Sequence, residues 1–495
     1  MAKVNTLLSV DGDGRIMFVY DNGSSIMNNA SKIEDFRKQG YKLIDQLSNY
    51  LLESLERTEP VIDLHEPDEE LSYWASQEIT DLADFHDKLF ARSIRLHHPH
   101  YIGHQVSAPE PEIALLGLTS DLMNNGMGIY EMGAAAVAME HLVIKTFAEH
   151  IGYKTDHSNG FLTSGGTLAN LTALLAARAK LYQQHPEINI NNAHILVSEQ
   201  AHFCIDRAWT TMGMNVNNLH KIPVNDAYQV DIVAMKSTVT TILAQPNQRI
   251  MAIVGCACTT ATGSYDDIAS LSDLCQQDNI WLHIDGAHGG AAIFSPKLKS
   301  QLLNQIHRAD SIIIDAHKMM LTPALATAVL FKDHMDGYNS FKQQADYLFD
   351  QSKIDAHNLA KRTFETTKLM MSIKVYYLLK KYGTGYIASF VERQTDLALW
   401  FYDHLMARET YECAHRPQTN ILCFRYVGCE PSEYGDVNHR IREHLLKSGN
   451  FYIVSTRLHG QLYLRVTIMN PATTKEHLIA LTDEINQIAS DYPNS

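Results

Sequence analysis

The sequence predicts an α/β protein with a large, mostly parallel sheet and a smaller C-terminal α+β domain. In the middle of the chain, short apolar strands alternate with helices, which is typical of a parallel sheet covered on both faces. Toward the C-terminus, strands that are more widely spaced mix with helices. We therefore expect an N-terminal arm with helices over residues 1–105, a large sheet domain over 106–375 and a small domain over 376–495.

The individual elements follow from the spacing of apolar residues. Apolar positions three and four residues apart predict helices over residues 31–57 and 78–92. Short apolar runs bounded by polar or small residues predict the strands. The remaining expected helices are 169–180, 233–243, 268–276, 368–381, 387–407 and 475–489, and the expected strands are 195–198, 251–256, 281–285, 311–315, 421–426 and 462–468.

Composition excludes several classes of protein. The net charge of -15 argues against nucleic acid or an anionic membrane as a partner, because both require a basic surface. No apolar run approaches the ~20 residues that a membrane span needs. The N-terminus lacks a basic segment followed by an apolar core, so we expect a cytoplasmic protein without a secretory signal. The seven cysteines have no zinc-site spacing, and we expect them to be reduced and packed, with no metal bound.

A glycine-containing turn precedes the helix that begins near Ala169. The segment is Thr163-Ser164-Gly165-Gly166-Thr167. Glycines let the backbone turn sharply and approach a phosphate, and a following helix offers unpaired N–H groups. The G-x-G-x-x-G spacing of a dinucleotide site is absent. On its own, the turn is compatible with a phosphate site and with an ordinary connection.

Three further segments carry polar residues where predicted strands end. His202 follows one strand, Asp285 closes the second and Lys318 comes three residues after the end of the third. A buried carboxylate such as Asp285 needs a cationic partner, and a protonated pyridine nitrogen is one. Burial disfavours the charged form of a lysine, so we expect Lys318 to lose its proton easily, as Schiff-base formation requires. Each residue alone has a structural interpretation. Together with the glycine turn, they predict a pocket for pyridoxal 5'-phosphate (PLP).

At these positions the sequence resembles the group II PLP-dependent amino-acid decarboxylases, a family that includes glutamate, cysteine-sulfinate, histidine and aromatic-amino-acid decarboxylases. The resemblance runs from about His98 to about Asn486 and rests on these motifs: His98-Pro99-His100-Tyr101, the glycine turn, Ala201-His202, Thr260, Asp285-x-Ala287, His317-Lys318 and Leu464-Arg465. It implies the aspartate-aminotransferase-like fold (fold type I of PLP enzymes) and a carboxy-lyase activity. It also implies a homodimer whose active sites lie at the subunit interface, with the N-terminal region taking part in dimerisation.

The resemblance also implies a role for each matching residue. Lys318 carries the cofactor, Asp285 keeps its ring nitrogen protonated, and His202 and Ala287 lie on opposite faces of the ring. The implied phosphate ligands are Gly165, Gly166, Thr167 and His317, and Thr260 lies beside the ring. Arg465 would bind the substrate carboxylate, which suits the fixed donor geometry of a guanidinium.

Other segments bear on the substrate. Tyr130-Glu131-Met132, Tyr347 to Lys353 and Asn470-Pro471-Ala472-Thr473 look closer to the glutamate and cysteine-sulfinate branch than to the aromatic branch. The resemblance therefore favours a small acidic amino acid: glutamate, aspartate or cysteine sulfinate. It also makes Tyr130 and His104 candidates for contact with the substrate.

The chain departs from the family pattern in one loop. In the relatives, a mobile loop carries a tyrosine that protonates the carbon left by carbon dioxide. Here residues 354–362 form a shorter segment without tyrosine, and His357 is the nearest polar candidate for that role.

This departure leaves several outcomes open. Relatives that lack the tyrosine can release an aldehyde and ammonia, and a transaminase, an aromatic or diaminobutyrate decarboxylase and a silent PLP-binding homologue also remain. A nicotinamide-dependent oxidoreductase has only the α/β alternation in its favour.

Overall fold

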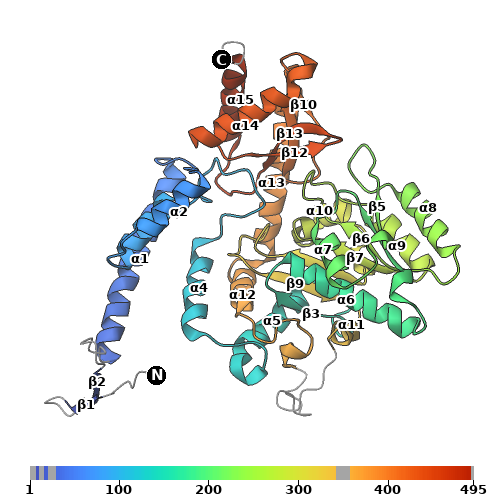
Figure 1. Ribbon diagram of the computed structural model, residues 1–495, viewed down its shortest axis with the longest axis horizontal. Helices are drawn as coiled ribbons and strands as arrows, with labels where there is room; N and C mark the ends of the chain where they lie inside the picture. Colours follow the sequence, from blue (N-terminus) through green and yellow to red (C-terminus); the bar gives the residue numbers. More distant parts are fainter. Residues whose placement is uncertain (1–6, 11–15, 20–28, 342–356, 492–495) are drawn as a thin grey trace. The chain divides into compact units, whose positions relative to one another are not determined.

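The computed structural model describes residues 7–10, 16–19, 29–341 and 357–491, and the chain forms two compact units, Met1–His98 and Pro99–Ser495 (Figure 1). The sequence-based boundaries at residues 105 and 375 remain predictions. No helix in the described part of the chain is both long and apolar enough to cross a membrane.

The N-terminal unit contains a short hairpin and three helices. The elements are β1 (Leu7–Val10), β2 (Ile16–Val19), α1 (Asn29–Glu56), α2 (Pro67–Ser76) and α3 (Leu82–Ala91). α1 confirms the helix expected over 31–57. α3 begins later than expected because the side chain of Asp81 caps it by accepting a hydrogen bond from the backbone N–H of Asp84. Helix α2 was not predicted. The rings of Tyr50 and Phe90 pack α1 against α3 at 4.8 Å.

A seven-stranded sheet forms the centre of the second unit, in the order β3-β9-β8-β7-β6-β4-β5. The strands are β3 (Asn159–Thr163), β4 (Ala193–Ser198), β5 (Leu219–Ile222), β6 (Arg249–Cys256), β7 (Trp281–Asp285), β8 (Ser311–Asp315) and β9 (Thr327–Phe331). β9 pairs antiparallel with both neighbours, and the other pairs are parallel. This confirms the mostly parallel sheet, and β7 and β8 have the predicted bounds.

Helices cover both faces of this sheet (Figure 1). The helices of this part of the chain are α4 (Pro111–Met123), α5 (Tyr130–Ile151), α6 (Gly166–Gln184), α7 (Cys204–Thr211), α8 (Ile232–Leu243), α9 (Ile268–Gln277), α10 (Pro296–Leu302), α11 (His334–Asn339) and α12 (Met371–Lys381). Of these, α5, α6, α8, α9 and α11 lie directly against strands of the sheet, and α4 packs on α12. In β8, Ile312 and Ile314 belong to one buried apolar cluster and Ile313 to another, which also contains residues of α6 and α7. Because successive side chains of a strand point to opposite faces, an uninterrupted apolar run is what a sheet covered on both sides requires.

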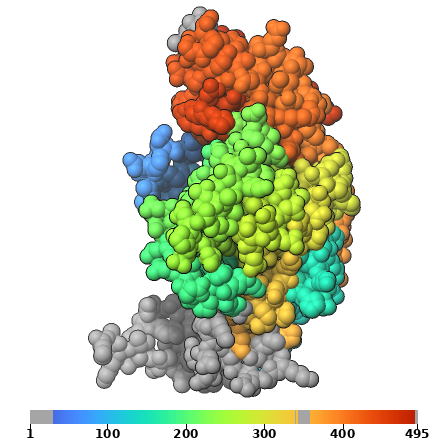
Figure 2. Space-filling view, turned by 90° about the vertical axis from the view of Figure 1, so that its right-hand side faces the viewer, coloured from blue at the N-terminus to red at the C-terminus, as the bar shows by residue number. Residues whose placement is uncertain are grey.

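The C-terminal part forms a second, antiparallel sheet in the order β10-β11-β13-β12. Its elements are α13 (Gly383–Met406), β10 (Tyr411–Cys413), β11 (Ile421–Tyr426), α14 (Tyr434–Ser448), β12 (Val454–Leu458), β13 (Gln461–Thr467) and α15 (Lys475–Ser490). The predicted α+β character is confirmed. In the space-filling view this part, coloured orange to red, forms one end of the unit (Figure 2). Its core includes Phe401, Leu422, Ile441 and Leu481.

Candidate active site

A cavity of about 460 Å³ lies where the parallel strands of the large sheet end. Open α/β sheets bind ligands at this edge, and a volume of ~300–1,000 Å³ suits a small molecule. The lining residues come from the ends of β3, β4, β6, β7 and β8 and from the first turns of α6 and α7. They are Ser164, Gly165, Gly166, Thr167, Leu168, Asn170, Leu171, His202, Cys204, Cys256, Cys258, Thr259, Thr260, Asp285, Ala287, His288, Asp315, His317, Lys318 and Leu325.

The glycine turn forms one wall of the cavity. β3 ends at Thr163, and α6 begins at Gly166. Gly165 has a φ of +133°, a conformation that residues with a side chain rarely adopt, which explains the glycine. The first N–H groups of α6 have no partner within the helix, so this wall offers donors and a positive dipole end to an anion.

Asp285 ends β7 and is 8% exposed. The backbone N–H of Ala287 donates to its Oδ1 at 3.1 Å, and the side-chain amide of Asn170 donates to its Oδ2 at 3.0 Å. Both donors are neutral, so they orient the carboxylate without balancing its charge. A cationic group bound in the cavity could therefore form a charged hydrogen bond with this carboxylate.

A chain of hydrogen bonds connects the side chain of Asn170 to buried polar groups of β7 and β8. The Oδ1 of Asn170 lies 2.7 Å from Nε2 of His283, and Nδ1 of His283 lies 2.8 Å from Oγ of Ser311. Trp281 Nε1 donates to the same Oγ at 2.9 Å. Burial lowers the pKa of His283 to about 4, so the ring is neutral near pH 7.

The directions of these bonds follow from the carboxylate at one end. A carboxylate only accepts, so the Asn170 amide nitrogen donates to Asp285 and the Oδ1 of Asn170 accepts from Nε2–H of His283. The neutral ring of His283 then accepts at Nδ1 from the hydroxyl of Ser311. Sequence patterns did not identify Asn170, since nothing local distinguishes it from other polar residues of a helix.

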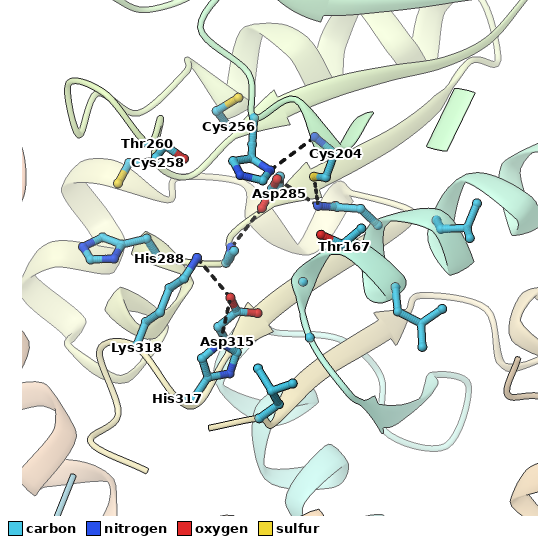
Figure 3. Close-up of a pocket in the computed structure, with 18 of the residues that line it drawn as sticks. Thr167, Cys204, Cys256, Cys258, Thr260, Asp285, His288, Asp315, His317 and Lys318 are labelled. Atoms are coloured by element: carbon cyan, nitrogen blue, oxygen red, sulfur yellow. Dashed lines mark hydrogen bonds and ion pairs between the residues drawn. The ribbon is translucent and has the colours of Figure 1, made fainter. Parts of the chain in front are cut away.

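Lys318 reaches the cavity from the segment after β8, and Figure 3 shows its amine between Asp285 and Asp315. Its Nζ lies 3.0 Å from Oδ2 of Asp315. Burial lowers the pKa of the Lys318 amine, but Asp315 and then Asp285 raise it, and the net pKa lies above its ordinary value. The expectation of an easily lost proton is therefore wrong for this protein without cofactor, because the two carboxylates outweigh the cost of burial.

The remaining cofactor candidates line the same cavity. They are His202, Thr260, Ala287 and His317, together with the glycine turn. Nδ1 of His202 accepts a hydrogen bond from the backbone N–H of Cys204 at 3.3 Å, and burial lowers the pKa of its ring. Nδ1 of His317 lies 3.0 Å from the carbonyl oxygen of Ala326, which holds the ring at the cavity wall.

The structure also places thiols and a further histidine at the cavity. Cys204, Cys256 and Cys258 line it, and all seven cysteines of the chain are free. Burial raises the pKa of Cys258 to about 12, so this thiol is protonated at neutral pH. Nε2 of the buried His288 lies 2.8 Å from Oδ1 of Asn420 in the small domain. In the described ranges, no three His, Cys, Asp or Glu side chains are grouped as metal ligands.

The candidate substrate residues lie outside the cavity lining. Arg465 is buried on β13 and donates through Nη2 to Oγ1 of Thr467 at 3.1 Å, while its Nε has no hydrogen-bond partner in the part of the chain that the structure describes. His104 is close enough for this guanidinium to lower its pKa, after the larger effect of burial. Tyr130 begins α5, and its ring lies 5.5 Å from that of His357.

Within one chain, and among the residues that the structure describes, His357 does not line the cavity. It is exposed, and its Nδ1 lies 3.3 Å from Nε2 of His141. The segments Tyr347 to Lys353 and Ile354 to Ala356, on which part of the substrate prediction and the shortened loop depend, lie outside the described residues.

Comparison with known proteins identifies the same chemistry. Residues 67–427 match the model of the pyridoxal-dependent decarboxylase conserved domain. An aromatic-L-amino-acid decarboxylase of Bacillus atrophaeus is 25% identical over 475 residues, covering 92% of this chain and 96% of that protein. An aspartate 1-decarboxylase of Aliivibrio fischeri (strain ATCC 700601 / ES114) is 27% identical over 456 residues, covering 82% of each.

The fold agrees with this match. The crystal structure of Oryza sativa TDC with PLP and tryptamine has a TM-score of 0.85 at 18% identity, covering 93% of this chain and 99% of that one. A likeness at this identity shows a shared fold, and the expected fold class is confirmed.

The cavity fits PLP on three independent points. Lys318 supplies an amine for the aldehyde, and the glycine turn supplies backbone donors for the phosphate. Among the described residues, the hydrogen-bond donors to the buried carboxylate of Asp285 are neutral, and a protonated ring nitrogen would add a charged donor.

Proposed function

This chain belongs to the pyridoxal-dependent decarboxylase family and is a PLP-dependent amino-acid decarboxylase, and we propose that its substrate is a small acidic L-amino acid. Glutamate, aspartate and cysteine sulfinate are the candidates, each giving carbon dioxide and the corresponding amine. The meeting of Lys318, Asp285 and the glycine turn in one cavity carries the assignment of the cofactor site, and the aspartate 1-decarboxylase relative supports the acidic substrate.

Bound PLP supplies an aldehyde that links to amines and a ring that takes up the electron pair of the broken Cα–carboxylate bond. In our proposal Lys318 holds the cofactor and gives way to the substrate amine. Asp285 keeps a proton on the ring nitrogen, which makes the ring an effective electron acceptor. Asn170 supports this role, since its amide holds Oδ2 of Asp285 in place.

The other cavity residues would position the cofactor. We assign the phosphate to Gly165, Gly166, Thr167 and His317, because a helix N-terminus favours an anion. His202 and Ala287 would bracket the ring and Thr260 would lie at its edge. These roles rest on position in the cavity together with the family resemblance.

Arg465 is our candidate for binding a substrate carboxylate. Its unpartnered Nε is buried, and the guanidinium is near enough to Cys258, a cavity residue, to interact with it electrostatically. His104 and Tyr130 would contact the substrate, and His357 would return a proton to the product carbon. The aspartate 1-decarboxylase relative favours an acidic substrate, and the aromatic relative favours the alternative.

We further propose a homodimer in the cytoplasm. α4 exposes Leu115, Leu118, Leu122 and Met123, at 47–67% of their surface. Several large apolar side chains exposed on one short helix favour an interface with a second copy. Light scattering tests this proposal, and a monomer at micromolar concentration would contradict it.

The test of the substrate is a carbon dioxide release screen. The PLP-loaded protein is incubated with carboxyl-labelled glutamate, aspartate, cysteine sulfinate, diaminobutyrate and the aromatic amino acids. We expect release from an acidic amino acid, and Arg465→Gln should raise KM for that substrate more than it changes kcat, because the guanidinium binds without reacting. Release from aromatic amino acids alone would contradict the proposal.

A second outcome has one observation in its favour, the absence of tyrosine from residues 354–362. Without that proton donor, the product carbon would give two electrons to dioxygen, which leaves as hydrogen peroxide, and hydrolysis by water would then release an aldehyde and ammonia. Measuring amine, aldehyde and ammonia in the same reaction separates the two outcomes. Amine equal to the carbon dioxide released supports clean decarboxylation.

A further inference from the structure

Asp315 is a buried carboxylate that has no role in the function proposed above. It ends β8 and is 2% exposed. Its Oδ1 accepts a hydrogen bond from Oγ1 of Thr327 at 2.6 Å, and its Oδ2 lies 3.0 Å from Nζ of Lys318. The carboxylate is thus fixed by Thr327 of β9 on one side. On the other side it contacts Lys318, as Figure 3 shows.

The same carboxylate lies against the glycine turn. A Cβ placed on Gly166 would be 3.2 Å from Oδ1 and 3.3 Å from Oδ2 of Asp315. Asp315 therefore bridges the turn and the amine. A carboxylate is a poor ligand for a phosphate, because two anions repel each other, so its contact with Lys318 needs another explanation.

Two carboxylates near the Lys318 amine favour its charged form. Burial and neighbouring cations keep His288 neutral, with its pKa lowered to about 3, and the thiol of Cys258 is protonated. His202 has its pKa lowered mainly by burial. His317 faces Asp315, with Nε2 3.6 Å from Oδ2. Among the described residues, Asp315 and Asp285 are the anions that act on this amine.

We propose that Asp315 is a positioning residue that holds Lys318 as an ammonium ion in the cofactor-free protein, so that cofactor uptake depends on opening this ion pair. The proposal rests on the proposed role of Lys318 as the cofactor-carrying residue. In this account Asp285 pairs with the ring nitrogen of the bound cofactor, whereas Asp315 acts on the Lys318 amine before the cofactor is linked to it.

The chemistry of uptake explains why this pair matters. An ammonium ion has no lone pair, so one proton must leave Nζ of Lys318 for the solvent. The neutral amine then forms a C=N bond with the aldehyde carbon, and the aldehyde oxygen leaves as water with the two remaining amine hydrogens. Below the pKa of the amine, the neutral fraction rises tenfold for each pH unit. Each unit by which Asp315 raises this pKa slows uptake about tenfold at fixed pH.

The first experiment measures PLP uptake by the cofactor-free protein. Asp315→Asn removes the charge and keeps an oxygen that accepts the hydroxyl hydrogen of Thr327. Uptake is followed by visible absorption from neutral pH to about pH 9, where an ordinary lysine amine is still mostly protonated. We expect the variant to take up PLP about tenfold faster at neutral pH, with its pH profile displaced to lower pH. Equal rates and profiles, or slower uptake by the variant, would overturn the proposal.

A second measurement needs neither PLP nor a variant. Formaldehyde and cyanoborohydride methylate neutral amines, and peptide mass spectrometry reports the extent at Lys318 as a function of pH. We expect Lys318 in the unmodified protein to titrate above the ordinary lysine value of 10.5. A midpoint below that value would overturn the proposal. Because the reagents contain no cofactor, this result is independent of whether PLP is carried at Lys318.

Asp336→Asn provides the matched control. Asp336 is also a buried carboxylate paired with a lysine, since its Oδ1 lies 3.1 Å from Nζ of Lys180, but it does not line the cavity. The control should leave both the uptake profile and the methylation of Lys318 unchanged. Displacement of either by the control would overturn the specific role of Asp315. Borohydride reduction then locates PLP. An adduct on another lysine would refute the proposed function while the titration result for Asp315 stands.

Discussion

Replacing Asn170 by alanine should impair catalysis without any change to a residue that contacts the reacting atoms. The amide of Asn170 is the side-chain donor to Oδ2 of Asp285, at 3.0 Å. Without this donor, one hydrogen bond to the carboxylate of Asp285 is lost and the charge on Oδ2 is less well stabilised. A proton shared between Asp285 and the ring nitrogen would then move toward the carboxylate, and the ring would accept electrons less well.

The size of the effect follows from the character of this bond. A hydrogen bond to a charged group contributes about 1.5–3 kcal/mol. Since about 1.4 kcal/mol corresponds to a factor of ten, we expect kcat to fall about tenfold to a hundredfold. The truncation also leaves Nε2 of His283 without its acceptor at 2.7 Å, so the melting temperature should fall as well.

The assay must separate these two effects. Turnover by carbon dioxide release, PLP content and the absorption spectrum of the bound cofactor are measured on the same preparation. Asn438→Ala is the matched control, because Asn438 is a buried asparagine of the small domain that bonds to Tyr426 and Tyr434. It should lower stability and leave the cofactor spectrum unchanged. Wild-type turnover in Asn170→Ala would refute the role of the hydrogen-bond chain.

Three further predictions concern the site and its support. Asp285→Asn should lower kcat at least a hundredfold while PLP content, measured after denaturation, stays close to that of the wild type; turnover near the wild-type value would contradict the role of the carboxylate. Gly166→Ala should weaken PLP affinity several-fold in an equilibrium titration, because the new Cβ would lie 3.2 Å from Oδ1 of Asp315, and unchanged affinity would argue against a phosphate at this turn. Lys368→Met should destabilise the fold by about 3–5 kcal/mol in denaturant unfolding, because it leaves Glu140 charged and buried without the partner now 2.6 Å away, and a loss below about 1 kcal/mol would contradict this.

The fold was predictable where local pattern and tertiary structure agree. β7, β8 and β11 have the bounds expected from short, mainly apolar runs. The antiparallel edge formed by β3 and β9 was not predicted, because the direction of a strand depends on how its connections cross the sheet. Such pairing leaves no local signature in an apolar run.

The site residues could be predicted from the sequence where the residue type and its position after a strand together indicate a chemical role. Asp285 and Lys318 stood out because a charged residue next to a buried strand needs a partner. Asn170 and His288 did not, since their importance comes from neighbours distant in sequence. The charge state of Lys318 was predicted in the wrong direction. The burial of Lys318 could be expected from the apolar strand before it, but the 3.0 Å contact between its Nζ and Oδ2 of Asp315 could not.

The most direct test of the account is borohydride reduction of the PLP-loaded protein, followed by peptide mass spectrometry of the wild type and of Lys318→Ala. We predict one reduced cofactor on Lys318 in the wild type and none in the variant. A cofactor adduct on another lysine, or one that persists in Lys318→Ala, would contradict the central claim that this lysine holds the cofactor opposite Asp285.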